Sequence, residues 1–548
     1  MTTTKAHELA KGQREISIAE FFEKNRHLLG FDNKRKALLT TVKEAVDNSL
    51  DACEEANILP DLQIEIVDMG NDRFRIIVED NGPGIVREQI PKIFAKLLYG
   101  SKFFKYSQSR GQQGIGISAS VMYGQLTTGR AAKILSKIHP TEPAHYYELK
   151  IDTKTNAPQI DQESKKDWNK DHGTKIQIDL EGFYQKGQQS VDEYIKETAI
   201  VNPHANIIYV NPRAEQYIFP RASEEKIPVA KEIKPHPYGV ELGRLMKMCD
   251  YAVEKNLKQF LMGSFSRVSA SVADELLEKS KLLPTKKPKS LNREDAERLL
   301  EAIKTTKIMM PPTDCISPIG EDLLLRGLKK EINAEFYAAV SRPPAVYRGN
   351  PFAVEVALAY GGALPKDGAI RLMRFANRVP LLFQQGACGV TDSVTKTSWK
   401  SYGLNQSGSN MPVGPAVVIV HLASVWVPFT SEAKEAIAHY PEILKEVKLA
   451  LQELGRKLSK YTAKKRRVSD ELKKRGHIEK YIPHIAGALE SLLGLTTEQK
   501  AKTEVELAAI LEHTRGKVED MTFDPKKNED FDEEFARIGK EDEHEESS

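Results

Sequence analysis

Hydrophobic and polar residues follow two different periods in the first 225 residues. Apolar residues at helical spacing are Leu39, Val42, Val46 and Leu50. This spacing predicts a helix with one face packed inward. Apolar residues that alternate with more polar ones are Phe74, Ile76 and Val78. The alternation predicts a strand that runs into the glycine turn at 80–84. Helices and strands therefore interleave in this part of the chain.

The pattern changes twice further along the chain. Residues 235–307 carry short helical patterns and no strand pattern. After the proline-rich stretch at 309–322, strand-like runs follow in "PFAVEVALAYGG", "AIRLMRFANRVPLLF" and "AVVIVHLASVWVPF". The last run is long and β-branched, which favours a buried strand. From Ser431 onward we expect several turns of helix, capped by Thr430 or Ser431 and kinked at Pro441.

Length and composition bound the class of protein. A chain of 548 residues is too long for one core, so two to four domains are expected. Its start lacks an apolar signal core and no run approaches eighteen apolar residues, so we expect a cytoplasmic protein. Four cysteines without any C-x-x-C pair argue against structural zinc and a disulfide framework. Buried, reduced thiols are the prediction.

Charge is unevenly distributed. The net charge is only +3, yet residues 528–548 hold ten acids against two bases, a balance of −8, which leaves +11 on residues 1–527. A basic body fits a nucleic-acid partner. A solvated basic surface is the alternative.

Two short stretches carry the candidate chemistry. Glu44 and Asn48 are four residues apart and project side by side from the predicted helix. Asp80 ends the predicted strand, where an acid can accept a hydrogen bond from an exocyclic amine, and Gly82 and Gly84 let backbone approach a flat ring. A carboxylate and an amide facing this turn suit an adenine nucleotide and its magnesium ion.

A glycine-rich loop supplies a third element. Gly111, Gly114 and Gly116 expose backbone amides just before an apolar helical stretch that begins near Ile117. Amides at a helix start attract phosphate. The loop matches neither the Walker pattern nor G-x-G-x-x-G, so alone it is a weak signal. All three elements in this order, followed by Gly173-Thr174 before the strand "KIQIDL", are a strong one.

These residues resemble the GHKL ATPase superfamily of gyrases, heat-shock chaperones, histidine kinases and mismatch-repair ATPases. The resemblance is closer to one family, the B subunits of archaeal-type DNA topoisomerase VI, and covers roughly residues 15–490. It rests on "KEAVDNSLDACEEA", "VEDNGPGI", "YGSKF", "SRGQQGIGISA", "FANRVPLLFQQGAC", "WKSYGL" and "VPFTSEAKEAIA".

The resemblance implies roles for individual residues. Glu44 would be the general base for the attacking water, and Lys434 a switch lysine that reaches the γ-phosphate when domains close. Asn48 would place its amide oxygen on Mg²⁺. Residues implied to contact ATP are Asn48, Asp80, Gly84, Ser101, Lys102, Arg110, Gly111, Gln112, Gln113, Gly114, Ile115, Gly116, Ile117, Thr174 and Lys434. Each role has a non-functional alternative. Glu44 could be a surface acid and Asn48 a surface asparagine of the helix. The stretch at Asp80 could be a simple Asn-Gly turn, and Lys434 could be a solvated lysine.

The same resemblance implies an α/β multidomain architecture. Residues 1–228 would form an N-terminal strap and a GHKL (Bergerat) ATPase α/β sandwich, and residues 229–308 a helix–two-turn–helix insert. Residues 309–475 would form a transducer, similar to ribosomal protein S5 domain 2, with a long C-terminal helix. Residues 476–515 would dock a partner, and residues 516–548 would be a disordered acidic tail. The strap either exchanges between two copies or packs on its own domain.

The implied function is that of the ATPase subunit of a type IIB DNA topoisomerase. ATP and Mg²⁺ would close two copies around double-stranded DNA, with an A₂B₂ heterotetramer near the nucleoid. No tyrosine is followed by a metal-binding acidic cluster, so DNA cleavage would belong to the A subunit. The rivals are a non-hydrolysing ATP-gated DNA clamp, a chaperone and a mismatch-repair ATPase.

Possible DNA contacts stay open at this stage. Trp399-Lys400-Ser401-Tyr402 could hold a nucleic-acid backbone, or Trp399 could be buried. Basic residues that face either DNA or solvent, or sit in a structural spacer, are Arg267, Lys286, Lys287, Lys289, Lys464, Lys465, Arg466 and Arg467.

Overall fold

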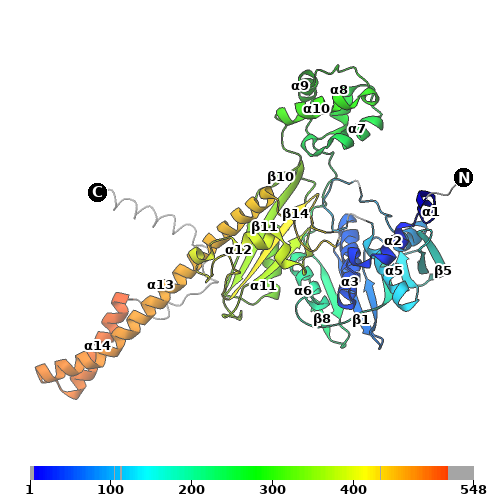
Figure 1. Ribbon diagram of the computed structural model, residues 1–548. Helices are drawn as coiled ribbons and strands as arrows, with labels where there is room; N and C mark the ends of the chain where they lie inside the picture. The colour runs from blue at the N-terminus through cyan, green and yellow to red at the C-terminus, as the bar shows by residue number, and fades with distance from the viewer. Residues whose placement is uncertain (1–4, 104, 112–113, 432, 516–548) are drawn as a thin grey trace.

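The computed structural model describes residues 5–103, 105–111, 114–431 and 433–515. Figure 1 shows two sheet-containing bodies side by side, a small helical body standing above them, and a long helix that leaves the molecule on one side. Within the described residues, no helix is both long and apolar enough to cross a membrane.

The first body is built on an eight-stranded sheet. Its strand order is β5-β4-β3-β6-β2-β1-β7-β8, and every neighbouring pair is antiparallel except β1 and β7. The strands are β1 (Asp61–Asp68), β2 (Arg73–Glu79), β3 (Ala132–Lys137), β4 (Ala144–Asp152), β5 (Ala157–Lys166), β6 (Gly173–Glu181), β7 (Asn206–Val210) and β8 (Gln216–Phe219). Burial alternates along β1 and β2, so one face of the sheet is covered.

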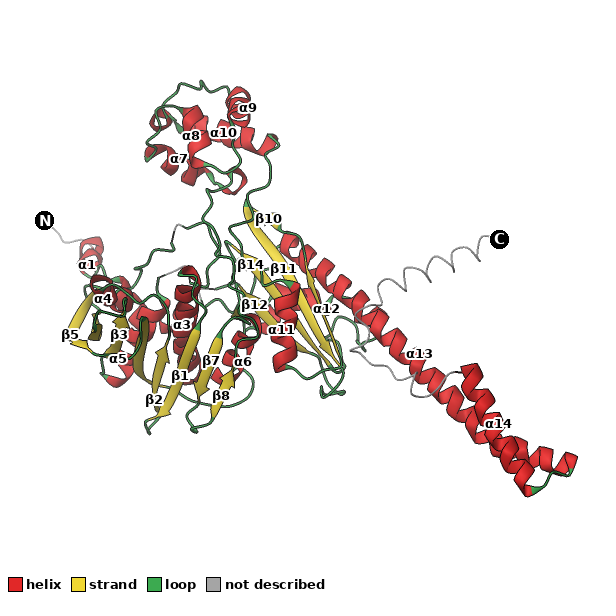
Figure 2. Cartoon of the chain, turned by 180° about the vertical axis from the view of Figure 1, so that it is seen from behind, coloured by secondary structure: helices red, strands yellow, loops and turns green. Residues whose placement is uncertain are grey.

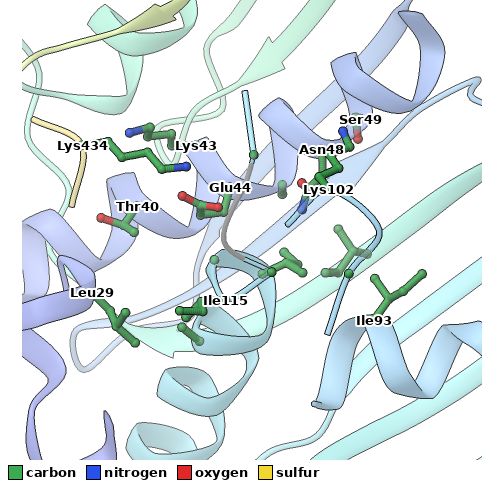
Figure 3. Close-up of a pocket in the computed structure, with 18 of the residues that line it drawn as sticks. Leu29, Thr40, Lys43, Glu44, Asn48, Ser49, Ile93, Lys102, Ile115 and Lys434 are labelled. Atoms are coloured by element: carbon green, nitrogen blue, oxygen red, sulfur yellow. The ribbon is translucent and has the colours of Figure 1, made fainter. Parts of the chain in front are cut away.

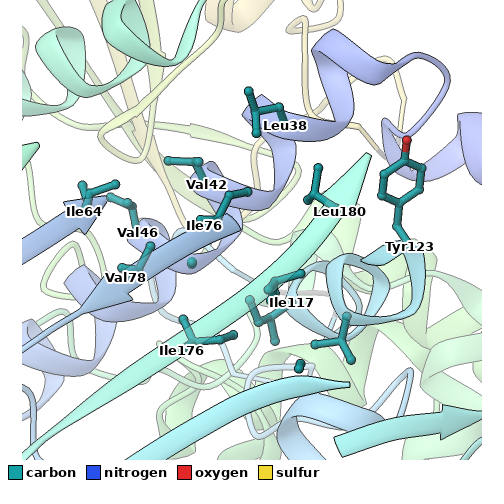
Figure 4. Packing of buried hydrophobic residues seen from close by; sticks show 14 of the residues in the cluster. Leu38, Val42, Val46, Ile64, Ile76, Val78, Ile117, Tyr123, Ile176 and Leu180 are labelled. Atoms are coloured by element: carbon teal, nitrogen blue, oxygen red, sulfur yellow. The ribbon is translucent and has the colours of Figure 1, made fainter. Parts of the chain in front are cut away.

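Helices cover that face. They are α3 (Lys34–Glu55), α4 (Ile90–Ala95), α5 (Gly116–Thr128) and α6 (Val191–Val201). Figure 4 shows Leu38, Val42 and Val46 of α3 directed at apolar side chains of β1, β2 and β6. The predicted helix and the predicted strand are therefore confirmed. Their inward faces form one core, and the opposite face of α3 is left to carry polar groups.

Two short helices precede this domain, α1 (Lys5–Lys11) and α2 (Ile18–Lys24). Ser17 caps α2 by accepting from the Glu20 amide, and its hydroxyl donates to the Thr153 carbonyl oxygen. Ala19 and Phe22 pack against the core of the same domain. In the single chain the strap thus packs on its own domain, and exchange between copies stays a prediction.

The small body contains helices only, as its pattern predicts. They are α7 (Leu242–Asp250), α8 (Leu257–Ser264), α9 (Ala270–Ser280) and α10 (Arg293–Thr305). Side chains of Asn256, Ser269 and Asn292 cap three of them, and Asp295 completes a capping box with Asn292. The four helices bury a core of their own.

The third body is a six-stranded sheet of order β10-β11-β14-β12-β13, with β9 paired to β11. Its strands are β9 (Phe336–Ser341), β10 (Ala345–Tyr347), β11 (Asn350–Tyr360), β12 (Arg371–Ala376), β13 (Val379–Pro380) and β14 (Ala416–Ser424). Every residue of β14 is buried, which confirms the predicted buried strand. One face packs on α12 (Gly389–Thr395) and the start of α13 (Pro441–Leu493), and the other on α11 (Glu321–Glu331) and the end of α6. The α6 contact joins the two sheet domains.

The long helix α13 spans 53 residues, about 80 Å. After it, α14 (Thr497–Arg515) folds back along its outer end, where Lys500 pairs with Glu490 (Figure 2). The predicted tail at 516–548 lies outside the described residues.

The predicted helix start at Thr430 or Ser431 is wrong. The helix begins at Pro441, which sits at its first turn, where proline's missing N–H costs nothing, and so does not kink it. The preceding segment is held instead by tertiary bonds, because Thr430 N donates to the Ala436 oxygen and Gly389 N to the Ile437 oxygen. Lys434 within it has a left-handed backbone, with φ of 54°.

Candidate nucleotide site

A cavity of about 670 Å³ opens between α3, the turn after β2 and the start of α5, with the Lys434 segment of the third body at its rim (Figure 3). Of the predicted catalytic and nucleotide-binding residues, those lining it are Glu44, Asn48, Asp80, Gly84, Ser101, Lys102, Gly111, Gly114, Ile115, Gly116, Ile117, Thr174 and Lys434. Gln112 and Gln113 lie outside the described residues. Folding thus gathers residues from five separate stretches of sequence into one cavity.

The polar side of α3 faces this cavity. Asn33 caps the helix by accepting from the Lys36 amide, and the apolar face of the helix is buried in the sheet. Glu44 and Asn48, one turn apart, both line the cavity, with Glu44 near Lys434 and Asn48 near Lys102 (Figure 3). A carboxylate and an amide side chain therefore line the same wall of the cavity.

Asp80 is fixed at the far end of the cavity. One carboxylate oxygen accepts from the amides of Gly82 (2.9 Å) and Thr174 (3.0 Å), and the other accepts from the Ser49 hydroxyl (2.7 Å). Burial raises the pKa of Asp80, and these three hydrogen bonds oppose that rise. The acid is thus held in one orientation where a purine amine could meet it.

Close packing requires glycine both in the turn after β2 and at the start of β6. A Cβ on Gly84 would lie 2.0 Å from the Lys137 carbonyl oxygen, and one on Gly173 would lie 2.3 Å from the Asp80 carbonyl oxygen. Both residues have positive φ, 74° and 142°. Gly84 lines the cavity, but what demands a glycine there is the contact of the turn with β3.

Gly111 and the residues from Gly114 to Ile117 line the other end of the cavity. Helix α5 begins at Gly116, so its first amides point at the cavity, as an anion site requires. Gly114 has φ of 59°, and a Cβ there would lie 2.5 Å from the Phe103 ring. A Cβ on Gly116 would lie 1.6 Å from Glu44 Oε2. The helix start and the carboxylate are therefore packed directly against each other.

Lys434 reaches the cavity from the other sheet domain. Its Nζ donates to the Arg110 carbonyl oxygen at 3.3 Å. Burial lowers the pKa of Lys434, while Glu44 acts to raise it. A half-buried ammonium beside Glu44 is placed to meet an anion in the cavity.

Arg110 differs from the expectation for a nucleotide contact. Its guanidinium, with the side chain 3% exposed, turns away from the cavity and pairs with Asp51, Glu54 and Asn202. Only its backbone oxygen faces the site. Lys102 pairs with Asp51 too, at 2.7 Å, yet still lines the cavity.

Asp47 is a site residue that the sequence reasoning missed. It lies beside Glu44 on α3, lines a smaller adjoining cavity of about 290 Å³, and accepts from the Tyr194 hydroxyl at 2.9 Å. Burial raises the pKa of Asp47 to about 7. Asp47 is next to Asn48 in the sequence, and this neighbour could have pointed to it. Helical spacing, however, places Asp47 between the buried face of α3 and the face that lines the cavity, so spacing alone did not assign it to the site.

Several suggested DNA contacts are engaged within the chain. Trp399 is 0% exposed and its Nε1 donates to the Val394 oxygen, so the buried alternative holds. Lys286 pairs with Asp295, and Arg267 donates to the Met310 oxygen. Lys465 pairs with Glu335.

The side chain predicted to hold magnesium lies at this cavity. Among the described residues no group of three His, Cys, Asp or Glu side chains gathers to hold a metal. The Asn48 amide lines the cavity. A single neutral ligand fits Mg²⁺, which usually keeps waters and binds nucleotide phosphates.

Each of the two sheet domains matches a known protein family. A family described as "Histidine kinase-, DNA gyrase B-, and HSP90-like ATPase" matches residues 33–181, and one described as "Topoisomerase VI B subunit, transducer" matches residues 311–474. The B subunit of type 2 DNA topoisomerase 6 from Methanosarcina mazei is 54% identical over 494 residues, 90% of this chain and 80% of that protein. The protein of that name from Archaeoglobus fulgidus is 50% identical, over 86% and 78%.

One solved structure illustrates a looser likeness. The B subunit of DNA gyrase from Myxococcus xanthus aligns with a TM-score of 0.40 at 12% identity, over 80% of this chain and 95% of that one.

Proposed function

The chain belongs to the family of type 2 DNA topoisomerase 6 B subunits, and we propose how its cavity binds and hydrolyses ATP to drive the topoisomerase cycle. As a family member it is the ATP-dependent ATPase subunit of a type IIB topoisomerase. The observation that carries the residue assignment is the convergence of Glu44, Asn48, Asp80 and Lys434 on one cavity.

Each end of the cavity is suited to a different part of ATP. Asp80, fixed by three donors, accepts from the adenine amine, and the start of α5 with Gly111 and Gly114 receives the phosphates. Glu44 lies against the first residue of α5, where it takes the proton of a water that attacks the γ-phosphate.

Asn48 would hold Mg²⁺ through its amide oxygen. The ion would supply positive charge beside the phosphates during hydrolysis. Because the amide is neutral, this ligand adds no negative charge beside the triphosphate.

Lys434 couples the two sheet domains to the state of the nucleotide. Its backbone belongs to the transducer, while its ammonium lies beside Glu44 and the Arg110 carbonyl. A γ-phosphate offers it a stronger, charged acceptor than a carbonyl does. ATP therefore draws the transducer toward the ATPase domain, and loss of the γ-phosphate releases it.

The far end of α13 is suited to hold the A subunit. Exposed apolar side chains at helical spacing form a stripe there: Ile478, Tyr481, Ile485 and Leu492. These residues lie within the predicted docking region 476–515, beyond the two sheet domains. We assign this stripe to the A subunit and expect two copies of each chain in the assembly, with double-stranded DNA between the B subunits. Exposed Arg466 and Arg467 on the same helix face that DNA.

The test measures ATP hydrolysis and relaxation of supercoiled DNA, with and without the A subunit. Glu44→Ala should bind ATP but lose turnover on the order of 10²–10⁴-fold. Asn48→Ala should weaken binding of Mg·ATP itself. Glu65→Ala removes an exposed acid from β1 and serves as the matched control.

If Glu44→Ala hydrolysed ATP at the rate of the parent protein, Glu44 would not be the general base. A parent chain that binds ATP and closes on DNA without any hydrolysis would instead be an ATP-gated clamp.

A further inference from the structure

A line of buried polar side chains runs from α3 into the transducer. On the ATPase side its centre is the Arg110 guanidinium. It donates to Asp51 (2.8 Å), to both carboxylate oxygens of Glu54 (2.7 Å each) and to the Asn202 oxygen (2.6 Å). Four such bonds fix the side chain in place, and they fix the loop that carries it.

Arg378 continues this line in the transducer. Its Nη1 lies 3.6 Å from Glu54 Oε1, and its Nη2 donates to the carbonyl and hydroxyl oxygens of Ser317 at 3.0 and 3.1 Å. The side chain is buried, so Glu54 is shared between an arginine of each domain. A buried charge of this kind is costly to leave unpaired.

The backbone at Arg378 is held from the opposite side. Its N–H donates to His421 Nε2 at 3.0 Å, so Nδ1 carries the imidazole proton and donates to Glu355 at 2.8 Å. Burial disfavours the charged form of Glu355, but His421 and the amides of Ile319 and Gly320 lower its pKa to about 2. An ionised acid on β11 thus anchors the turn.

The turn itself is unusual in sequence. Asn377 and Arg378 connect β12 to β13 and both have positive φ, 48° and 65°. A two-residue hairpin of this kind favours Asn-Gly, because glycine has no Cβ to strain. Arginine in the glycine position costs backbone energy, which persists only where the surroundings demand the side chain.

This turn contacts the segment 109–111 at the phosphate end of the nucleotide cavity. Asn377 Nδ2 donates to the Ser109 oxygen at 3.0 Å, while Arg378 holds Glu54, which holds Arg110. The next residue, Gly111, lines the nucleotide cavity, and the Arg110 carbonyl is the acceptor of Lys434. Contacts from the transducer therefore set the position of residues 109–111.

We propose that Arg378 is a positioning residue for ATP turnover, acting from the transducer through Glu54 and Arg110 on the loop 109–111. The inference rests on the proposed ATPase function and adds a second link between the domains, independent of the Lys434 ammonium. Because the link orients the phosphate end and leaves Asp80 untouched, its loss lowers turnover and spares ADP binding.

The test uses Arg378→Gly in the full chain. Glycine suits the turn, so the variant removes the guanidinium and relieves the backbone. Arg371→Ala is the matched control: Arg371 lies on β12, also crosses to the ATPase domain, and pairs with Glu193 and Glu197 (2.8 and 3.1 Å) without contacting the loop. We expect kcat to fall about tenfold or more in Arg378→Gly, with ADP affinity and the kcat of Arg371→Ala within about twofold of the parent.

Hydrogen exchange of the 105–111 amides gives a readout that needs no turnover. We expect faster exchange in Arg378→Gly and no change in Arg371→Ala. Unchanged exchange and kcat in Arg378→Gly would overturn the proposal, as would equal losses in both variants or a parallel loss of ADP affinity. A parent without hydrolysis would refute the proposed function instead, while faster exchange would still show that Arg378 positions the loop.

Discussion

Replacing Gly116 with alanine tests the placement of Glu44 without touching Glu44 itself. The new methyl carbon would lie 1.6 Å from Oε2, 2.2 Å from Cδ and 2.9 Å from Cγ of that side chain. To reach the 3.4 Å of ordinary contact, Oε2 must move by about 1.8 Å. The fold should survive, because the obstacle is the end of a flexible side chain and alanine favours a helix by up to about 1 kcal/mol over glycine.

The cost should fall on the chemical step. Misplacing a reacting group by about 1 Å can cost on the order of 10²-fold, and losing a general base on the order of 10²–10⁴-fold. We therefore expect kcat to drop by about 10²-fold or more, with little change in ADP affinity or in melting temperature.

Steady-state hydrolysis, ADP calorimetry and thermal melting make up the assay. Gly243→Ala is the control, since Gly243 lies in the first turn of α7 and a Cβ there meets nothing within 4 Å. In a Glu44→Ala background, Gly116→Ala should cost nothing further, because the displaced group is already gone. Parental turnover by Gly116→Ala, or additive losses in the double variant, would refute this reading of the site.

Four further outcomes follow from the same geometry. Asp80→Asn should fold, since the Ser49 hydroxyl can turn to accept from the new amide, but ATP affinity by calorimetry should fall by roughly 1.5–3 kcal/mol; unchanged affinity would remove Asp80 from the site. Lys434→Ala should barely change ADP affinity while lowering ATP turnover and analogue-induced compaction in small-angle scattering; equal compaction of both proteins would show that Lys434 does not report the γ-phosphate. Burial raises the pKa of Asp47 to about 7, so the folded chain retains a proton that the unfolded chain releases above about pH 4. Stability should then decline as pH rises between those values, by at most on the order of 4 kcal/mol, and Asp47→Asn should flatten this dependence of melting temperature; an unchanged slope would contradict it. A non-hydrolysable ATP analogue should convert monomers to dimers in sedimentation, and one unchanged mass would count against an ATP-operated gate.

Local patterns were enough to predict the elements that hold the site. The helical spacing of Leu39 to Leu50 and the alternation before Asp80 each describe a single face of a single element, and burial of that face follows from hydrophobicity alone. The glycine turn and the glycine-rich loop were also readable, because each needs a backbone that other residues adopt with strain.

Sequence could not predict the partners of charged residues far apart in the chain. Arg110 stands among glycines of a phosphate loop, yet three acceptors on α3 and at the end of α6 bury its guanidinium. Arg378 meets Glu54 across a domain contact. Ion pairs of this kind depend on distances that only the packed domains set.

Tertiary contacts also overrode a local preference near Lys434. The stretch "SEAKEAIA" has a helical composition, and a helix was predicted from Ser431. In the structure Ala436 and Ile437 are buried in the transducer core, and Gly389 binds the Ile437 carbonyl, so the chain stays irregular until Pro441. Helix propensity is worth tenths of a kcal/mol per residue, less than burying one such side chain. Because burial outweighed helix propensity, Lys434 lies in a left-handed backbone conformation beside Glu44.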